Sequence, residues 1–280
     1  MPDALLEVDN LSKSFAGVHA LEGYSLRLAP LAIHGVIGPN GAGKTTLFNL
    51  LTGFLRPSAG RIRLEGRDIT GLPAYRVARL GLARTFQNIR LFGALTVLEN
   101  VRTALQSQAP APLLGTLLSS PAFRRREQAL TEQADALLAR LGLASRRDQL
   151  ARNLPYGDQR KLEIARAVAL RPKVLLLDEP NAGMNPAETT ELLGLIRALR
   201  DDLRITIVMV AHDIPLVMNL CERIQVLNYG RLIAEGDPHA VRTNPEVIAA
   251  YLGQPAEAVG SLPAVEAPLP SPFPARREGE

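Results

Sequence analysis

A glycine-rich segment near the N-terminus has the residue types and spacing that bind phosphate groups. Residues 38–45 read Gly-Pro-Asn-Gly-Ala-Gly-Lys-Thr and match the pattern G-x-x-x-x-G-K-[ST] in full. The glycines let backbone N–H groups surround phosphate oxygens, and a helix beginning there adds partial positive charge. We expect Lys44 to reach the β- and γ-phosphates and the Thr45 hydroxyl to ligate Mg²⁺. The predicted ATP-binding residues of this loop are Gly38, Asn40, Gly41, Gly43, Lys44, Thr45 and Thr46.

Two carboxylates follow a run of four aliphatic residues. Val174–Leu177 is such a run, and Asp178 and Glu179 come directly after it. A carboxylate at the end of a buried strand is placed to bind Mg²⁺, directly or through water. Glu179 is then the candidate general base that polarises the attacking water, a role that contributes about 10²–10⁴-fold to rate.

A histidine ends the next apolar run. His212 follows Ile205–Val210, and in an open α/β sheet a residue at a strand end lies near the crevice where ligands bind. We therefore predict that His212 contacts the γ-phosphate and holds the water and Glu179 in line. His19, His34 and His239 lack this context and are predicted to be structural or surface residues.

The elements that must position these residues alternate between strands and helices. Short strands are predicted at Leu5–Val8 and Ser25–Leu28, and a third, Ile33–Ile37, runs into the glycine-rich loop. The β-branched and aliphatic runs that precede Asp178 and His212 suit strands buried on both faces of a parallel sheet. A helix carrying an apolar stripe at Leu130, Ala134, Leu137, Leu138 and Leu141, stopped by Gly142, belongs to a mainly helical insertion over about residues 87–171. The pattern between Ala104 and Ser120 is broken and predicts a loop or loosely packed helices.

Composition limits the class of protein. The single cysteine, Cys221, excludes an intramolecular disulfide and fits a reducing compartment. No stretch approaches the roughly 20 apolar residues that a membrane helix needs. The net charge of +4 is compatible with nucleic acid, an anionic membrane or nucleotide phosphates and does not decide between them. Residues 255–280 are rich in Pro, Ala, Glu and Ser and are predicted to form a disordered tail.

Four further segments, together with those above, resemble the ATP-binding subunits of ABC transporters over about residues 4–254. Gln87 resembles the family's Q-loop glutamine, which touches Mg²⁺ and the water. Residues 154–159, Leu-Pro-Tyr-Gly-Asp-Gln, stand at the position of the signature motif, where Tyr156, Gly157 and a helix N-terminus of one subunit cap the ATP held by another. Residues 182–185 stand at the D-loop position, and Phe15 stands where an aromatic ring stacks on adenine.

The resemblance implies an α/β fold: a P-loop NTPase core with a parallel sheet, an N-terminal antiparallel β subdomain and an inserted helical subdomain, together spanning residues 1–254. It implies ATP and Mg²⁺ as cofactors, with Thr45, Gln87 and Asp178 around the metal and Glu179, His212 and Gln87 as catalytic residues. The implied partners are two transmembrane permease subunits, a second and distinct ATP-binding subunit and, indirectly, a periplasmic or extracellular substrate-binding protein, and nucleic acid is not expected. The implied location is peripheral, at the cytoplasmic face of the membrane.

More narrowly, residues 84–92, 96–101 and 182–186, with the long insertion between Val101 and Leu154, resemble the larger ATP-binding subunit of branched-chain amino acid importers. One alternative is the homodimeric ATPase of a lipopolysaccharide-type exporter, whose subunits are close relatives. Another is a soluble ABC ATPase acting on ribosomes or DNA, which would usually have two cassettes or a long coiled coil. A metabolic P-loop kinase leaves Gln87 and residues 154–159 without a role.

The chain departs from the family pattern at several positions. Pro155 replaces the signature serine, Asp158 replaces a glutamine and adds negative charge near phosphate, and Asn185 stands where many members have Asp. Leu31-Ala32 replaces a Gly-Glu pair, a change to which we assign no function. We hypothesise that the composite site using this signature hydrolyses ATP more slowly than its twin, so that removing the base in each subunit gives unequal losses.

Overall fold

A six-stranded sheet carries the predicted site. The computed structural model describes residues 4–108, 121–211 and 214–252. Within these ranges the sheet has the order β10-β9-β3-β8-β7-β6, in which only the β9–β10 pair is antiparallel. Its strands are β3 (Ile33–Ile37), β6 (Leu82–Arg84), β7 (Val174–Asp178), β8 (Thr206–Val210), β9 (Arg223–Asn228) and β10 (Arg231–Gly236). The parallel core predicted from the apolar runs is confirmed.

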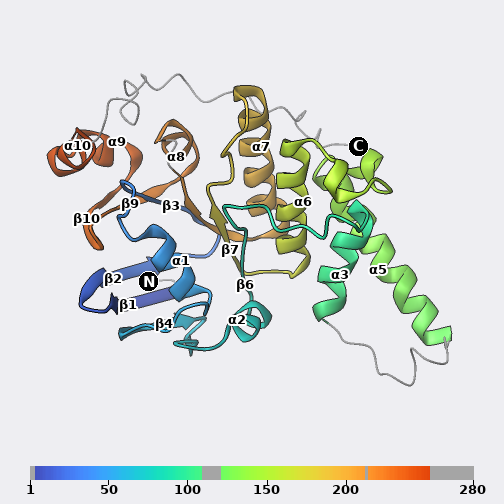
Figure 1. Ribbon diagram of the computed structural model, residues 1–280, viewed down its shortest axis with the longest axis horizontal. Helices are drawn as coiled ribbons and strands as arrows, with labels where there is room; N and C mark the ends of the chain where they lie inside the picture. Colours follow the sequence, from blue (N-terminus) through green and yellow to red (C-terminus); the bar gives the residue numbers. More distant parts are fainter. Residues whose placement is uncertain (1–3, 109–120, 212–213, 253–280) are drawn as a thin grey trace, which may run out of the picture.

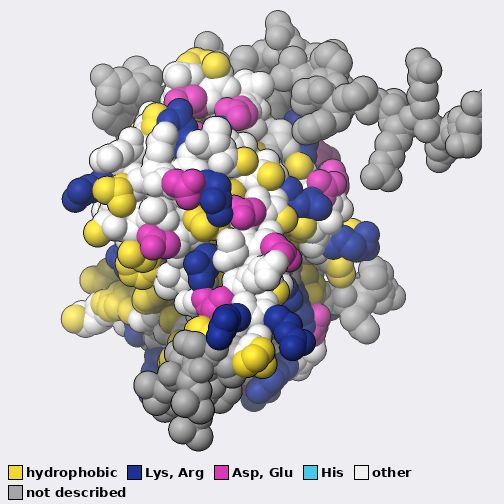
Figure 2. All heavy atoms as spheres, turned by 90° about the vertical axis from the view of Figure 1, so that its right-hand side faces the viewer, with side chains coloured by type: hydrophobic (Ala, Val, Ile, Leu, Met, Phe, Trp, Pro, Cys, Tyr) yellow, Lys and Arg dark blue, Asp and Glu magenta, His cyan; other side chains and the backbone are white. Residues whose placement is uncertain are grey.

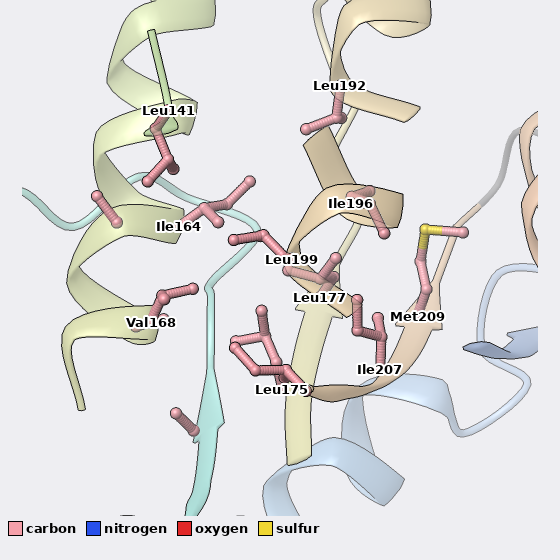
Figure 3. Packing of buried hydrophobic residues seen from close by; sticks show 14 of the residues in the cluster. Leu141, Ile164, Val168, Leu175, Leu177, Leu192, Ile196, Leu199, Ile207 and Met209 are labelled. Carbon is pink, nitrogen blue, oxygen red and sulfur yellow. The ribbon is translucent and has the colours of Figure 1, made fainter. Parts of the chain in front are cut away.

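The central strands are buried on both faces. In β7, Leu175 and Leu177 belong to one hydrophobic cluster, and Val174 and Leu176 belong to the other. This division follows from the alternation of side chains along a strand. Figure 3 shows the first cluster, where Leu175 and Leu177 meet side chains of the helices α6 (Tyr156–Ala169) and α7 (Pro186–Leu203). The sheet therefore packs against one hydrophobic cluster on each face.

The second cluster joins the sheet to an antiparallel sheet of order β2-β1-β4-β5. Its strands are β1 (Leu6–Phe15), β2 (Val18–Leu28), β4 (Ala59–Leu64) and β5 (Arg67–Asp68), and they lie beside helix α1 (Lys44–Leu51) (Figure 1). Strands β1 and β2 are longer than predicted, because pairing continues past Val8 through register shifts that break the simple alternation of polar and apolar residues.

The described chain between β6 and β7 is mainly helical. Helices α3 (Val97–Gln108), α5 (Pro121–Arg140) and α6 pack on one another at one end of the molecule (Figure 1). Leu130, Ala134 and Leu138 of the predicted stripe are buried, Leu137 is half-buried, and Gly142 has the positive φ of +71° that a helix stop favours. The predicted irregular segment proves helical as far as Gln108, and residues 109–120 lie outside the described ranges. The division into domains stays a prediction, as does the tail, which the structure does not describe.

The other helices surround the sheet: α2 (Ala74–Leu80), α8 (Ile214–Leu220), α9 (Pro238–Thr243) and α10 (Pro245–Leu252). On the face formed by the helical end, Lys and Arg alternate with Asp and Glu (Figure 2), as in the ion pairs Arg102–Glu127 and Arg147–Asp135. Side chains of both charges are therefore present on this face. None of the helices in the described ranges combines the length and apolarity required to cross a membrane.

His34 is buried in β3, and its Nε2 has no hydrogen-bond partner among the described residues. Burial lowers the pKa of His34 to about 4. In the unfolded chain, His34 protonates near pH 6.5. The stability that depends on neutral His34 is therefore fully present above that pH and is lost as the pH falls to about 4. We expect this residue to contribute about 3 kcal/mol to the acid loss of stability.

Urea unfolding between pH 7 and pH 4 would measure this contribution. His34→Leu is expected to lose less stability on acidification than the unchanged chain. His239 is exposed, so His239→Leu provides a matched control for the substitution itself. Equal slopes for the His34 variant and the unchanged chain would contradict the prediction.

Candidate nucleotide-binding site

The glycine-rich loop connects β3 to α1 in the predicted strand–loop–helix order. Gly38 has a φ of +155°, and a Cβ there would lie 2.1 Å from the carbonyl oxygen of Leu227. Gly43 has a φ of +102°, and a Cβ there would lie 2.5 Å from the carbonyl oxygen of Ala20. These two positions therefore require glycine for steric reasons as well as for phosphate approach.

The loop borders a pocket of about 280 Å³. The lining brings together most of the residues predicted for the nucleotide, namely Asn40, Gly41, Gly43, Lys44, Thr45, Thr46, Gln87 and Glu179. Gly38 lies at the base of the same loop and outside the lining. The pocket stands at the carboxyl ends of β3, β7 and β8, where Val210 pairs with both Val36 and Asp178. This edge is where ligands bind in open α/β sheets.

Lys44 is the cation of this pocket. Its ammonium donates hydrogen bonds to the carbonyl oxygens of Gly38 at 2.6 Å and Pro39 at 2.8 Å. Burial lowers the pKa of Lys44 to about 8, while the charges of Glu179 and Asp178 act in the opposite direction. A phosphate group would favour the protonated ammonium more strongly than two carbonyls do.

Asp178 is buried at the end of β7 and pairs with an arginine from β6. The Nη2 of Arg84 donates to Asp178 Oδ2 at 2.8 Å, and Arg84 Nη1 donates to Asn49 Oδ1 at 2.7 Å. Burial raises the pKa of Asp178, and Arg84 opposes that rise. The backbone N–H of Asp178 also donates to the Thr85 hydroxyl at 3.2 Å. One carboxylate oxygen is thus fixed by Arg84, which orients the other.

Glu179 and Gln87 meet at the pocket. Gln87 Nε2 donates to Glu179 Oε2 at 3.0 Å, so the predicted base and the predicted Q-loop amide are in direct contact. Glu179 has a φ of +47°, a conformation that costs non-glycine residues energy and that clusters at functional sites. Its backbone N–H donates to the Val210 carbonyl at 2.8 Å, which ties the base to the end of β8.

The residues around this pair fit Mg²⁺. Hard cations take oxygen ligands, and Mg²⁺ is usually held by one or two carboxylates with phosphates and waters. Asp178 bonds to Arg84 through one carboxylate oxygen, so the other oxygen is not used by that contact. Thr45 is exposed in the pocket lining. Gln87 contacts Glu179 through its side-chain nitrogen, so that contact does not use its side-chain oxygen. Within the described ranges, no group of three or more His, Cys, Asp or Glu is placed to hold a metal ion.

The signature segment forms the start of α6. Pro155 is the N-cap of this helix, and no side chain caps the helix. The half-exposed ring of Tyr156 lies against Gly183, where a Cβ would come within 3.1 Å of Tyr156 Cε1. Gly157 is buried, and a Cβ there would meet Glu188 Oε1 at 3.0 Å. The signature and D-loop segments therefore touch within one chain.

The negative charge of Asp158 is compensated locally. Arg146 Nε lies 2.7 Å from Asp158 Oδ2, and Lys161 Nζ lies 3.9 Å from Asp158 Oδ1. This pairing reduces the repulsion toward phosphate that the substitution suggested. The hypothesis of two unequal ATP sites stays a prediction that rests mainly on Pro155.

Asn185 is the N-cap of α7. Its side chain accepts from the Glu188 backbone N–H at 3.0 Å, and Glu188 Oε2 accepts from the Asn185 N–H at 2.9 Å, which forms a capping box. Asn185→Ala is expected to lower the free energy of unfolding by about 1 kcal/mol, whereas Asn185→Asp retains the cap. Urea unfolding would measure both, and equal losses for the two variants would contradict this role.

Phe15 and His212 have predicted roles that the structure does not test. Phe15 ends β1 and is half-exposed, with Lys13 Nζ 5.0 Å from its ring centre, and it is absent from the pocket lining. Its role toward adenine stays a prediction. His212 lies outside the described residues, and its role also stays a prediction.

Sequence reasoning assigned no role to three charged residues near the site: Arg84, Arg160 and Glu163. Arg84 was noted only as part of a family segment. Arg160 and Glu163 are buried on α6 next to Gln87. The sequence offered one indication that Arg160 and Glu163 are buried, because the neighbouring residues Leu162 and Ile164 belong to the core.

A phosphate-binding loop after β3, a carboxylate pair after β7 and a glutamine in contact with the second carboxylate define a P-loop nucleotide hydrolase. The chain belongs to the ABC transporter family, whose model matches residues 21–182, more than half of its length. It therefore binds ATP and is an ATPase coupled to transport. A second model, for branched-chain amino acid ATP-binding cassette transporters, matches residues 231–257.

Named relatives agree with this assignment. The high-affinity branched-chain amino acid transport ATP-binding protein LivG of Salmonella typhimurium is 47% identical over 254 residues, covering 91% of this chain and all of that protein. The lipopolysaccharide export system ATP-binding protein LptB of Acidithiobacillus ferridurans is 36% identical over 249 residues, 89% of this chain and 95% of that protein. The crystal structure of an ABC transporter ATP-binding cassette in its ADP conformation superimposes with a TM-score of 0.77 at 30% identity, covering 90% of this chain and 99% of that one. The predicted α/β ABC ATPase fold is confirmed.

Proposed function

We propose that this chain is the ATP-hydrolysing subunit that energises an importer of branched-chain or other hydrophobic amino acids. The observation that carries the proposal is the identity of 47% to LivG over that relative's whole length, compared with 36% to LptB. The subunit would work at the cytoplasmic face of the membrane. Its partners would be two permease subunits, a second and distinct ATP-binding subunit and, indirectly, a substrate-binding protein.

The pocket supports a hydrolytic mechanism. Lys44 would exchange the carbonyls of Gly38 and Pro39 for the β- and γ-phosphates. Thr45, Gln87 and Asp178 would hold Mg²⁺, which would supply positive charge next to the phosphates. Glu179 would take a proton from the attacking water, and Gln87 would hold the carboxylate through its amide.

Four further residues would contact nucleotide. His212 would contact the γ-phosphate, and Phe15 would stack on adenine. The start of α6, with Tyr156 and Gly157, would cap the ATP held by the partner ATPase, because helix N-termini favour anions.

Purification of the tagged chain from its own membranes, followed by mass spectrometry, would test the partners. Two different permeases and a second ATPase are expected, and branched-chain amino acids presented by the binding protein should stimulate ATP hydrolysis in the reconstituted complex. Recovery of this chain alone as ATPase with one permease pair would instead favour the exporter, for which the identity to LptB is the supporting observation. Ribosomes or DNA without any membrane protein would overturn both.

A further inference from the structure

Arg160 on α6 is almost completely buried, which is unusual for an arginine. Its guanidinium does not face solvent or phosphate but holds the backbone that carries Gln87. Nη1 donates to the Phe86 carbonyl at 2.7 Å, and Nη2 donates to the Gln87 carbonyl at 2.5 Å. Nη2 also donates to the Tyr156 hydroxyl at 3.2 Å.

Glu163, one turn further along α6, accepts a hydrogen bond from the same backbone segment. Its Oε1 accepts from the Phe86 N–H at 3.1 Å, and its Oε2 accepts from Arg160 Nη1 at 3.0 Å. The two side chains therefore make three hydrogen bonds to the backbone of Phe86 and Gln87. Because these contacts go to the main chain, they fix the position of that segment whatever side chains it carries.

The side chain of Gln87 continues this connection to Glu179, which it contacts at 3.0 Å. An unbroken path thus runs from α6 through the Arg160–Glu163 pair and the backbone of Gln87 to the proposed base. The path begins at Tyr156, at the start of the signature helix. Gln87 itself is exposed, and its backbone carbonyl is held by Arg160.

Stability alone does not account for the pair. A buried ion pair is often no more stabilising than apolar side chains of similar volume. Burial raises the pKa of Glu163, and Nε of Arg160 has no hydrogen-bond partner among the described residues. The contacts of the pair are well suited to placing a backbone segment.

We propose that Arg160 and Glu163 are positioning residues for Gln87. They set where the Gln87 amide meets Glu179, and they make Gln87 move together with the signature helix. Closure of α6 over the partner's ATP and placement of the Gln87 amide then occur as one event. This inference rests on the proposed ATPase mechanism and adds to it the residues that position the glutamine.

The test uses the reconstituted complex with the double variant Arg160→Met/Glu163→Leu. It removes both charges together and keeps apolar volume, so the fold is expected to survive. Phe86 is half-buried and Gln87 exposed, so water can replace the lost backbone partners. We expect kcat for ATP hydrolysis to fall about 10–100-fold with KM for ATP unchanged, because misplacement of a catalytic group by about 1 Å has effects of that size.

A second measurement separates positioning from a structural defect. If the pair acts through Gln87, the double variant should add nothing to Gln87→Ala, whereas independent effects would multiply. Glu163→Gln preserves the shape of the side chain and should give a smaller loss of kcat than the double variant. If the double variant does not fold, Glu163→Gln takes its place in the comparison with Gln87→Ala. Arg102→Met, which removes the half-buried pair with Glu127 between α3 and α5, is the matched control and should leave kcat unchanged.

The outcomes distinguish this inference from the proposed transport function. An unchanged kcat, or losses that multiply with Gln87→Ala, would overturn the positioning role while leaving the importer assignment intact. If the complex without substitutions hydrolyses ATP but does not respond to branched-chain amino acids, the proposed substrate is overturned. The comparison of the double variant with Gln87→Ala would still decide the role of the pair.

Discussion

Glu179→Gln is expected to lower kcat for ATP hydrolysis by at least about 10²-fold while leaving ATP binding intact, because a glutamine cannot accept the proton of the attacking water. The substitution keeps the side-chain volume and leaves the strain of the left-handed backbone at φ +47° unchanged. Lys44 and the loop glycines are unchanged, so affinity for ATP should be retained. Single-turnover hydrolysis and nucleotide binding on the reconstituted complex would measure both quantities.

A matched control is available on α7. Glu191 is exposed and pairs with Lys161, so Glu191→Gln changes the net charge equally without entering the pocket, and its kcat should be unchanged. Equal loss of binding and hydrolysis in Glu179→Gln would mean that the carboxylate supports the pocket and does not act as a base. A kcat within a few-fold of the unchanged complex would remove Glu179 from the chemistry.

The residues at strand ends were predictable because local pattern determines them. Runs of aliphatic residues identify β3 and β7, and the parallel arrangement places whatever follows them at one edge of the sheet. Gly38, Lys44, Asp178 and Glu179 therefore reach one region of the structure. The assignment of Gln87 to the site came instead from the family resemblance, since 92 positions separate it from Glu179, and the contact between the two residues was not predicted.

The contacts that support the site were not predictable from local pattern. Arg84 reaches Asp178 across 94 positions, and Arg160 reaches Gln87 across 73. On α6, Arg160 and Glu163 have the i, i+3 spacing of an ordinary exposed ion pair, and only the position of the 84–92 segment in space makes them buried. The lengths of β1 and β2 depend likewise on register shifts that leave little trace in sequence.

The second prediction with a large expected effect concerns the ion pair Arg84–Asp178. Both side chains are nearly buried, at 6% and 7% exposure, and the guanidinium also lies 4.8 Å from the centre of the Phe86 ring. Arg84→Met leaves the carboxylate of Asp178 buried without its cation. We expect a loss of about 3–5 kcal/mol in the free energy of unfolding. Urea unfolding at neutral pH would measure it, with Arg102→Met at a half-buried pair expected to cost less than about 1 kcal/mol.

The pH dependence of this loss identifies its cause. Burial raises the pKa of Asp178 above its unfolded value, and removal of Arg84 must raise it further. The folded variant then binds a proton more readily than the unfolded chain, so its deficit is largest at neutral pH and shrinks as the pH falls through the raised pKa. The double variant Arg84→Met/Asp178→Asn should recover part of the stability at neutral pH, because it buries no charge. A deficit that is independent of pH, with no recovery in the double variant, would show that Arg84 acts through its packing on Phe86 and not through Asp178.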